Sequence, residues 1–453
     1  MAFPSVVKSM TLIILILAMV SMPLPLPGQE IPPGTDRWNR AALEWIGLLQ
    51  NGEFDEAGAR VDPAVPEGSL GPPQLEAIWG QLMAQLGTLR SFLPGVVLEQ
   101  GPYHIVRVPA EFQSQSFILQ VTLTDALEVS GFFIQPPEPP PYEPPSYVDQ
   151  NAFDEEEVTV GSDPWSLPGT LTIPTGEGPF PAVVLVHGSG PNDRDESIGG
   201  NRPFKDLAWG LASFGVAVLR YEKRTRVHGP SLPADIGLEE EVIADALLAL
   251  ELVRNRPETS QVFLFGHSLG GMMAPEIGKR DGRLDGIAIL AAPVRPFFET
   301  LRTQLEYLKG LAANADSPGS RQIDSILSVI AAVERGEAPD DQAVLGAPPA
   351  YWKEVAAVDP VETARGLSES LIILQGGRDY QATTEDLEIW ARELGDQPSV
   401  MTKLYPDLSH LFISGDGMAT PAEYATQPGH VAEEVILDLV KWIQRAGAGE
   451  GAL

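Results

Sequence analysis

One segment of the chain combines the residue types and the spacing that make a serine hydroxyl nucleophilic. The segment GHSLG, with its serine at Ser268, follows the pattern Gly-x-Ser-x-Gly. The apolar run VFLF precedes it and GMMA follows it, which predicts a strand, a strained turn and a helix. A serine in such a turn lies at a helix N-terminus, where developing negative charge is favoured. A simple tight turn is the alternative interpretation of the same pattern.

A nucleophilic serine requires a base, and the base requires an acid that orients it. Asp379 lies just after the predicted strand 371–374, and His410 lies on the loop after the predicted strand 401–404. Loops after parallel strands meet at the carboxyl edge of a sheet. We therefore predict that Ser268, Asp379 and His410 form a nucleophile, acid and base triad.

A competing acid stands close to the predicted base. Asp407 precedes His410 by three residues on the same loop. From that position it is poorly placed to orient the imidazole from the far side, so Asp379 is favoured.

Two backbone N–H groups are expected to bind the oxyanion that forms during acyl transfer. The first is that of Leu269, directly after the serine. The second lies in the segment HGSG after the predicted strand 182–186. Ser189 is the expected donor there and Gly190 the alternative, while His187 is expected to brace the loop rather than to act as a second base.

The elements that must position these residues occupy the C-terminal two thirds of the chain. Strand and helix patterns alternate in residues 150–453, which predicts an α/β fold with a doubly wound, mostly parallel sheet. AVVLV is apolar throughout, as a strand buried on both faces requires. The pattern changes to helices with Pro and Gly breaks at about residues 295–365, and we expect this insertion to be a helical cap over the site.

A small α+β domain with a cone-like shape is predicted for residues 31–135. Helical spacing of apolar residues at 38–49 and 74–86 is followed by strand-like runs. This order resembles the small domain of the nuclear-transport-factor-2 type. A proline-rich linker at residues 136–149 contains PPEPPPYEPP, which favours a polyproline II spacer.

The first 30 residues are typical of a targeting segment. A lysine precedes the apolar run MTLIILILAMVSM, which is shorter than a membrane span. We therefore predict a signal peptide and an exported protein, periplasmic or secreted, with an uncleaved N-terminal anchor as the alternative.

The bulk composition excludes several classes of function. The formal net charge is −32, so neither nucleic acid nor an anionic membrane surface is an expected partner. Cysteine is absent, and the six histidines form no His-x-His or His-x₃-His pair. We accordingly expect no metal and no cofactor.

Five motifs together resemble those of the EstD-type bacterial esterases, in the serine aminopeptidase-like group of the α/β-hydrolase superfamily. They are HGSGPNDRDE, RYEKR, GHSLGG, LQGGRDYQ and YPDLSHLF. The resemblance implies a serine carboxylesterase that acts on short-chain esters, with Ser268, Asp379 and His410 as its catalytic residues. A peptidase or aminopeptidase, an acyl thioesterase, and a binding module with an inactive site are the alternatives.

Overall fold

The computed structural model describes residues 36–66, 68–113, 116–135, 141–233, 235–311, 318–338 and 347–447. The predicted targeting segment and the first part of the predicted linker lie outside these residues. The chain divides into two compact units, with the boundary between Pro140 and Pro141. Residues 141–149, predicted as linker, therefore belong to the second unit. Tyr147 attaches them there, because its hydroxyl donates to the carbonyl oxygen of Val431 at 2.8 Å.

The N-terminal unit is the predicted α+β unit. Asp36 begins its first helix by accepting hydrogen bonds from the N–H groups of Trp38 and Asn39. The five-stranded sheet has the order β1-β3-β4-β5, with β2 on β3, and all its pairs are antiparallel. Its elements are α1 (Arg37–Asn51), α2 (Phe54–Ala59), α3 (Pro72–Leu86), β1 (Leu89–Phe92), β2 (Val96–Gln100), β3 (Tyr103–Phe112), β4 (Ser116–Thr124) and β5 (Val129–Gln135). The sequence patterns did not predict α2, β1 or β2.

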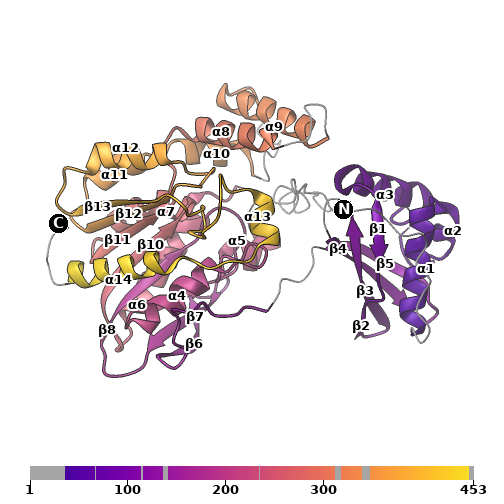
Figure 1. The fold of residues 1–453 in the computed structure, drawn as a ribbon, viewed down its shortest axis with the longest axis horizontal. Coiled ribbons are helices and arrows are strands. Elements are labelled where there is room, and N and C mark those ends of the chain that lie inside the picture. The colour runs from indigo at the N-terminus through magenta and orange to yellow at the C-terminus, as the bar shows by residue number, and fades with distance from the viewer. Residues whose placement is uncertain are drawn as a thin grey trace. The chain divides into compact units, whose positions relative to one another are not determined.

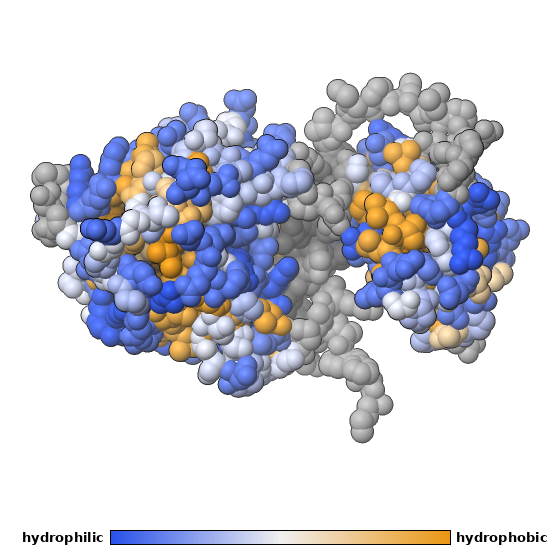
Figure 2. Space-filling view, turned by 90° about the horizontal axis from the view of Figure 1, so that it is seen from below, coloured by the Kyte–Doolittle hydropathy of each residue, from blue (hydrophilic) through white to orange (hydrophobic). Residues whose placement is uncertain are grey.

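Apolar side chains gather on the surface of this N-terminal unit (Figure 2). Its exposed large apolar residues include Val96 on β2 and Phe133 on β5, with 63% and 56% of their surface accessible. The opposite face of the sheet holds the core with Val106, Leu119 and Val121. The alternation along each strand therefore separates a buried face from a partly apolar open face.

The second unit is built on an eight-stranded sheet of order β13-β12-β11-β10-β8-β9-β7-β6. The pairs among β8 to β13 are parallel, and β7 and β6 add an antiparallel edge. This is the doubly wound, mostly parallel sheet that was predicted. Its strands are β6 (Phe153–Val160), β7 (Leu167–Pro174), β8 (Phe180–Val186), β9 (Ala217–Tyr221), β10 (Thr259–His267), β11 (Gly286–Leu290), β12 (Ser370–Gly376) and β13 (Val400–Tyr405).

Helices cover both faces of this sheet (Figure 1). The helices described in this unit are α4 (Pro203–Ser213), α5 (Arg224–His228), α6 (Ala244–Arg254), α7 (Leu269–Asp281), α8 (Phe297–Gly310), α9 (Pro318–Glu334), α10 (Pro349–Ala356), α11 (Pro360–Arg365), α12 (Thr384–Leu394), α13 (Pro421–Thr426) and α14 (Glu433–Gly447). One turn of π-helix, Glu239–Ile243, leads into α6. Within the described ranges, no helix is both long and apolar enough to cross a membrane.

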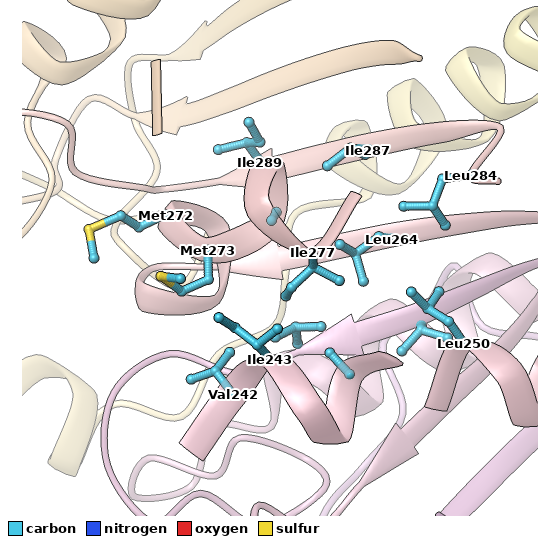
Figure 3. Close-up of a cluster of buried hydrophobic side chains, with 14 of the residues drawn as sticks. Val242, Ile243, Leu250, Leu264, Met272, Met273, Ile277, Leu284, Ile287 and Ile289 are labelled. Atoms are coloured by element: carbon cyan, nitrogen blue, oxygen red, sulfur yellow. The ribbon is translucent and has the colours of Figure 1, made fainter. Parts of the chain in front are cut away.

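Each face of the sheet has its own hydrophobic core, and alternate residues of a strand enter different cores. On β8, Val183 and Leu185 pack with α4 and α14, whereas Val184 packs with α6 and α7. Figure 3 shows the second core, in which Met273 and Ile277 of α7 lie among apolar side chains of the neighbouring helix and strands. β10 is packed in the same way on both sides, because Leu264 belongs to this second core and Phe263 and Phe265 to the first.

In its described part, the predicted insertion at residues 295–365 contains four helices between β11 and β12. The last of them, α11, packs against α7 and α12 and so belongs to the layer that covers the sheet. The other three, α8, α9 and α10, gather outside that layer (Figure 1). These three helices are called the cap below.

Candidate active site

Ser268 occupies a strained turn between β10 and α7. Its backbone has φ 52° and ψ −116°, a conformation that costs free energy for any residue but glycine. The flanking glycines are required sterically: a Cβ on Gly266 would lie 2.3 Å from the carbonyl oxygen of Gly270, and one on Gly270 would lie 2.2 Å from that of Val186. The strand, turn and helix expected from GHSLG are therefore present.

His410 pairs with Asp379. The ring Nδ1 lies 2.7 Å from Asp379 Oδ2, and both side chains are almost fully buried. Gln375 Nε2 donates to the same oxygen at 3.0 Å, while the N–H groups of Gln381 and Ala382 donate to Oδ1 at 2.7 and 3.2 Å. These donors hold the carboxylate in place, so that it can orient the imidazole.

The competing acid of the sequence analysis does not contact the imidazole. Asp407 is exposed on the surface side of its loop, whereas Asp379 lies beneath His410. The parallel register of β10 to β13 places the loops that carry Ser268, Asp379 and His410 at one edge of the sheet. A direct contact supports this placement, since the ring of His267, the residue before Ser268, lies 3.0 Å from the carbonyl oxygen of His410.

The loop after β8 passes beside the nucleophile. A Cβ on Gly188 would lie 3.1 Å from the Cβ of Ser268, so a larger residue there would crowd the serine. Within the described residues, the next two N–H groups of the loop, on Ser189 and Gly190, donate to no other group. Leu269 is the first residue of α7, where N–H groups have no acceptor inside the helix. Both predicted oxyanion donors therefore lie on segments next to Ser268.

Comparison with known proteins decides the family. The sequence pattern described as "Alpha/beta hydrolase family" matches residues 183–427. Esterase EstD of Thermotoga maritima is 41% identical over 408 residues, which cover 90% of this chain and 95% of that protein. The chain belongs to the α/β hydrolase family. The resemblance to the EstD-type esterases that the motifs indicated is thereby confirmed.

Solved structures with a similar fold are more distant. Est1E from Butyrivibrio proteoclasticus is 14% identical with a TM-score of 0.44, and the match covers 64% of this chain and 99% of that one. The Pyrococcus furiosus esterase Pf2001 is 15% identical with a TM-score of 0.42, and the match covers 68% and 97% of the two chains.

His187 has the environment of a bracing residue in this α/β hydrolase. Its ring is buried and lies 4.9 Å from the ring of Phe204 and 5.3 Å from that of Tyr221, centroid to centroid. Burial lowers the pKa of His187 to about 4, because the charged imidazolium is poorly solvated there. The ring is therefore neutral at neutral pH and packs as an aromatic side chain.

A second buried histidine and carboxylate lie beside the first pair. His267 Nδ1 is 2.9 Å from Glu196 Oε2, although the contact is not aligned as a hydrogen bond. Burial alone would raise the pKa of Glu196 and lower that of His267. The attraction between the two charges outweighs burial, so that the pKa of Glu196 is lowered and that of His267 is raised. Both shifts favour the carboxylate form of Glu196 and the imidazolium form of His267.

Glu196 and His267 connect three parts of the site. Glu196 Oε1 accepts a hydrogen bond from the N–H of Gly188 at 2.6 Å, and His267 Nε2 contacts the carbonyl oxygen of His410. The pair therefore links the loop after β8, the residue before Ser268 and the loop of the base. Sequence analysis did not find this role, although Glu196 ends the motif HGSGPNDRDE.

The cap rests on the loop that carries the acid. Gln304 Nε2 of α8 donates to the carbonyl oxygen of Gln381 at 2.8 Å, and the ring of Tyr307 stacks on that of Tyr380 at 5.0 Å. Tyr380 and Gln381 directly follow Asp379. The cap therefore contacts the loop after β12, directly beyond Asp379.

A metal centre is not apparent in the described part of the chain. No three His, Asp or Glu side chains there are grouped so that they could hold an ion.

Proposed function

We propose that this α/β hydrolase is a serine carboxylesterase that cleaves short-chain carboxylic esters through an acyl-enzyme. The observation that carries the proposal is the buried 2.7 Å contact between His410 and Asp379, at the edge where the Ser268 turn and the Gly188 loop meet. The 41% identical relative named as an esterase supports the substrate class.

In this mechanism, His410 accepts the hydroxyl proton of Ser268 while the serine oxygen attacks the ester carbonyl carbon. Asp379 binds the Nδ1–H and thereby keeps Nε2 free to act as the base. The carbonyl oxygen becomes an oxyanion, which the N–H groups of Leu269 and Ser189 bind. The C–O bond then breaks, and the alcohol leaves with the proton from His410.

The second half of the reaction repeats the first with water. His410 removes a proton from a water molecule, whose oxygen attacks the acyl carbon on Ser268. The bond to the serine oxygen breaks, the carboxylic acid leaves, and the proton returns to Ser268. Each step needs only groups of this chain, the ester and water.

A substrate panel separates this proposal from the peptidase and thioesterase alternatives. We expect p-nitrophenyl acetate and butyrate to be hydrolysed with kcat/KM at least 100-fold above that of aminoacyl p-nitroanilides or acyl-CoA thioesters. Rates are compared with the purified protein at fixed pH and ionic strength, because the net charge of −32 makes the surrounding field depend on salt. A faster reaction with anilides would favour the peptidase instead.

We also propose that residues 1–30 direct export of the protein. The short apolar run after a lysine supports this. Cell fractionation and the N-terminal sequence of the recovered protein test it and distinguish a cleaved signal peptide from an anchor.

A further inference from the structure

A buried lysine contacts the loop after β8 at Gly188. Lys223 follows β9, is almost fully buried, and donates from Nζ to the carbonyl oxygen of Gly188 at 2.8 Å. Asn192 Nδ2 donates to the same oxygen at 3.1 Å. A charged donor is a strong one, so this carbonyl is held in a fixed direction.

The carbonyl of Gly188 and the N–H of Ser189 belong to one planar peptide group. The described residues have cis peptide bonds only at 163–164 and 178–179, so this peptide is trans. In a trans peptide, the C=O and the N–H point in opposite directions. Fixing the oxygen toward Lys223 therefore fixes the Ser189 N–H on the other side, away from the ammonium.

The ammonium group of Lys223 is connected to the cap through the carboxylate of Glu241. Its Nζ lies 2.6 Å from Glu241 Oε1 in the π-helical turn, and the other oxygen of Glu241 accepts a hydrogen bond from the Tyr351 hydroxyl at 2.6 Å. Burial and the nearby Glu241 carboxylate raise the pKa of Tyr351 far above its usual range. The hydroxyl therefore stays protonated and remains a donor. Tyr351 belongs to α10 of the cap.

We propose that Lys223 is a positioning residue for oxyanion binding, and that Glu241 and Tyr351 couple its position to the cap. The cation fixes the Gly188–Ser189 peptide and draws electron density from it, which makes the Ser189 N–H a better donor. The proposal rests on the proposed function, in which that N–H binds the oxyanion. Its effect belongs to the transition state, so it lowers the barrier without tightening substrate binding.

The test uses the double variant Lys223→Met/Glu241→Gln, which removes the cation without leaving a buried carboxylate unpaired. Removal of a whole oxyanion donor costs about 10²- to 10³-fold in kcat. For a displaced donor we expect a loss of about 10- to 100-fold in kcat, with KM within threefold. Affinity for an alkyl trifluoromethyl ketone, which adds to the serine as a charged hemiketal, should fall by a similar factor.

The next residue provides a matched control. Arg224 forms a buried ion pair with Asp245, with Nε 2.9 Å from Oδ2, and in the described structure neither residue hydrogen-bonds to the loop after β8. The variant Arg224→Met/Asp245→Asn should lower the melting temperature but keep kcat within threefold. An equal loss of kcat in this control, or kcat within threefold in the Lys223 variant, would overturn the proposal.

The role of the cap has a separate test. Tyr351→Phe should lower kcat about two- to tenfold, and it should cause no further loss when added to the Lys223→Met/Glu241→Gln variant. If the kcat losses of Tyr351→Phe and of the Lys223→Met/Glu241→Gln variant multiply when they are combined, the coupling through Lys223 is contradicted. Failure of the proposed function itself is distinguishable, because it would appear as retained ester hydrolysis by Ser268→Ala.

Discussion

Two buried pairs of a histidine and a carboxylate lie side by side at the active site, and they differ in what the second ring nitrogen does. The rings of His410 and His267 are 4.6 Å apart, and each has a carboxylate oxygen within 3 Å of Nδ1. His267 Nε2 contacts a backbone carbonyl, whereas in the described structure His410 Nε2 has no such partner. A histidine paired with a carboxylate therefore contacts the backbone through its second ring nitrogen in one place, whereas in the other that nitrogen is available to act as a base.

The two carboxylates also differ in their other partners. Asp379 accepts three hydrogen bonds from Gln375, Gln381 and Ala382 besides its contact with His410. Among the described residues, Glu196 has only the Gly188 N–H as a hydrogen-bond donor besides its contact with His267. Loss of the histidine should therefore leave Asp379 satisfied but leave Glu196 largely uncompensated. Substitutions in the His410–Asp379 pair should therefore affect mainly catalysis, and substitutions in the His267–Glu196 pair mainly stability.

The largest expected effect is that of His410→Gln. Loss of the base should lower kcat by about 10⁴-fold or more, as expected for a residue of a triad. The free energy of unfolding should change by no more than about 1 kcal/mol, because the carboxylate of Asp379 keeps its other donors. Steady-state kinetics and urea unfolding of the same preparation check both values. A kcat within tenfold of the original protein would remove His410 from the mechanism.

A smaller catalytic effect and a larger loss of stability are expected for Glu196→Gln. The substitution removes the charge opposite His267, so the free energy of unfolding should fall by about 2–3 kcal/mol. The amide oxygen can still accept from Gly188, and kcat should fall no more than tenfold. The same two measurements apply. A loss of kcat as large as that of His410→Gln, without loss of stability, would contradict the expected difference between the two pairs.

The smallest expected effect is a dependence of stability on pH. The pKa of His267 is raised in the folded protein, so its contribution is fully present below about pH 6.5 and is lost as pH rises through the raised value. The pKa of Glu196 is lowered, so its contribution is present above about pH 4.5 and is lost in stronger acid. The Glu196–His267 pair should therefore stabilise the folded protein most between about pH 4.5 and 6.5.

Thermal melting of the original protein and of His267→Gln measures this dependence. The gap between the two melting temperatures should be larger at pH 6 than at pH 9. Protonation of His187, with its pKa of about 4, destabilises both proteins in acid and cancels in the gap. One kcal/mol corresponds to about 2–4 °C for a domain of this size. A gap that is equal at both pH values, or larger at pH 9, would show that His267 is not held as an imidazolium.

The sequence predicted those parts of the fold that local patterns encode. AVVLV and VFLF are apolar throughout because strands buried on both faces have no polar side, and they are β8 and the end of β10. The edge strand β6 was not predicted, since its sequence FDEEEVTV is mostly exposed and polar. Short strands of the N-terminal unit were missed for a similar reason, because β2 is largely exposed.

The site residues could be predicted from two features alone, which are their order along the chain and their position directly after a strand. Asp379 was preferred to Asp407 on that ground, and the structure places it against His410. Glu196 and Lys223 could not be found in this way. Glu196 contacts a residue 71 positions later, and Lys223 contacts Gly188, 35 positions earlier. Such contacts arise from tertiary packing, and in the sequence these residues are indistinguishable from charged surface residues.

Covalent labelling tests most directly whether Ser268 is the nucleophile. Diethyl p-nitrophenyl phosphate transfers its phosphoryl group to an activated serine and releases p-nitrophenol. We expect one equivalent of p-nitrophenol per chain, with the added mass on the peptide that contains Ser268 and complete loss of esterase activity. Ser268→Ala should bind no label and should hydrolyse esters at least 10⁴-fold more slowly. Label on another residue, or ester turnover by Ser268→Ala close to that of the original protein, would contradict the account.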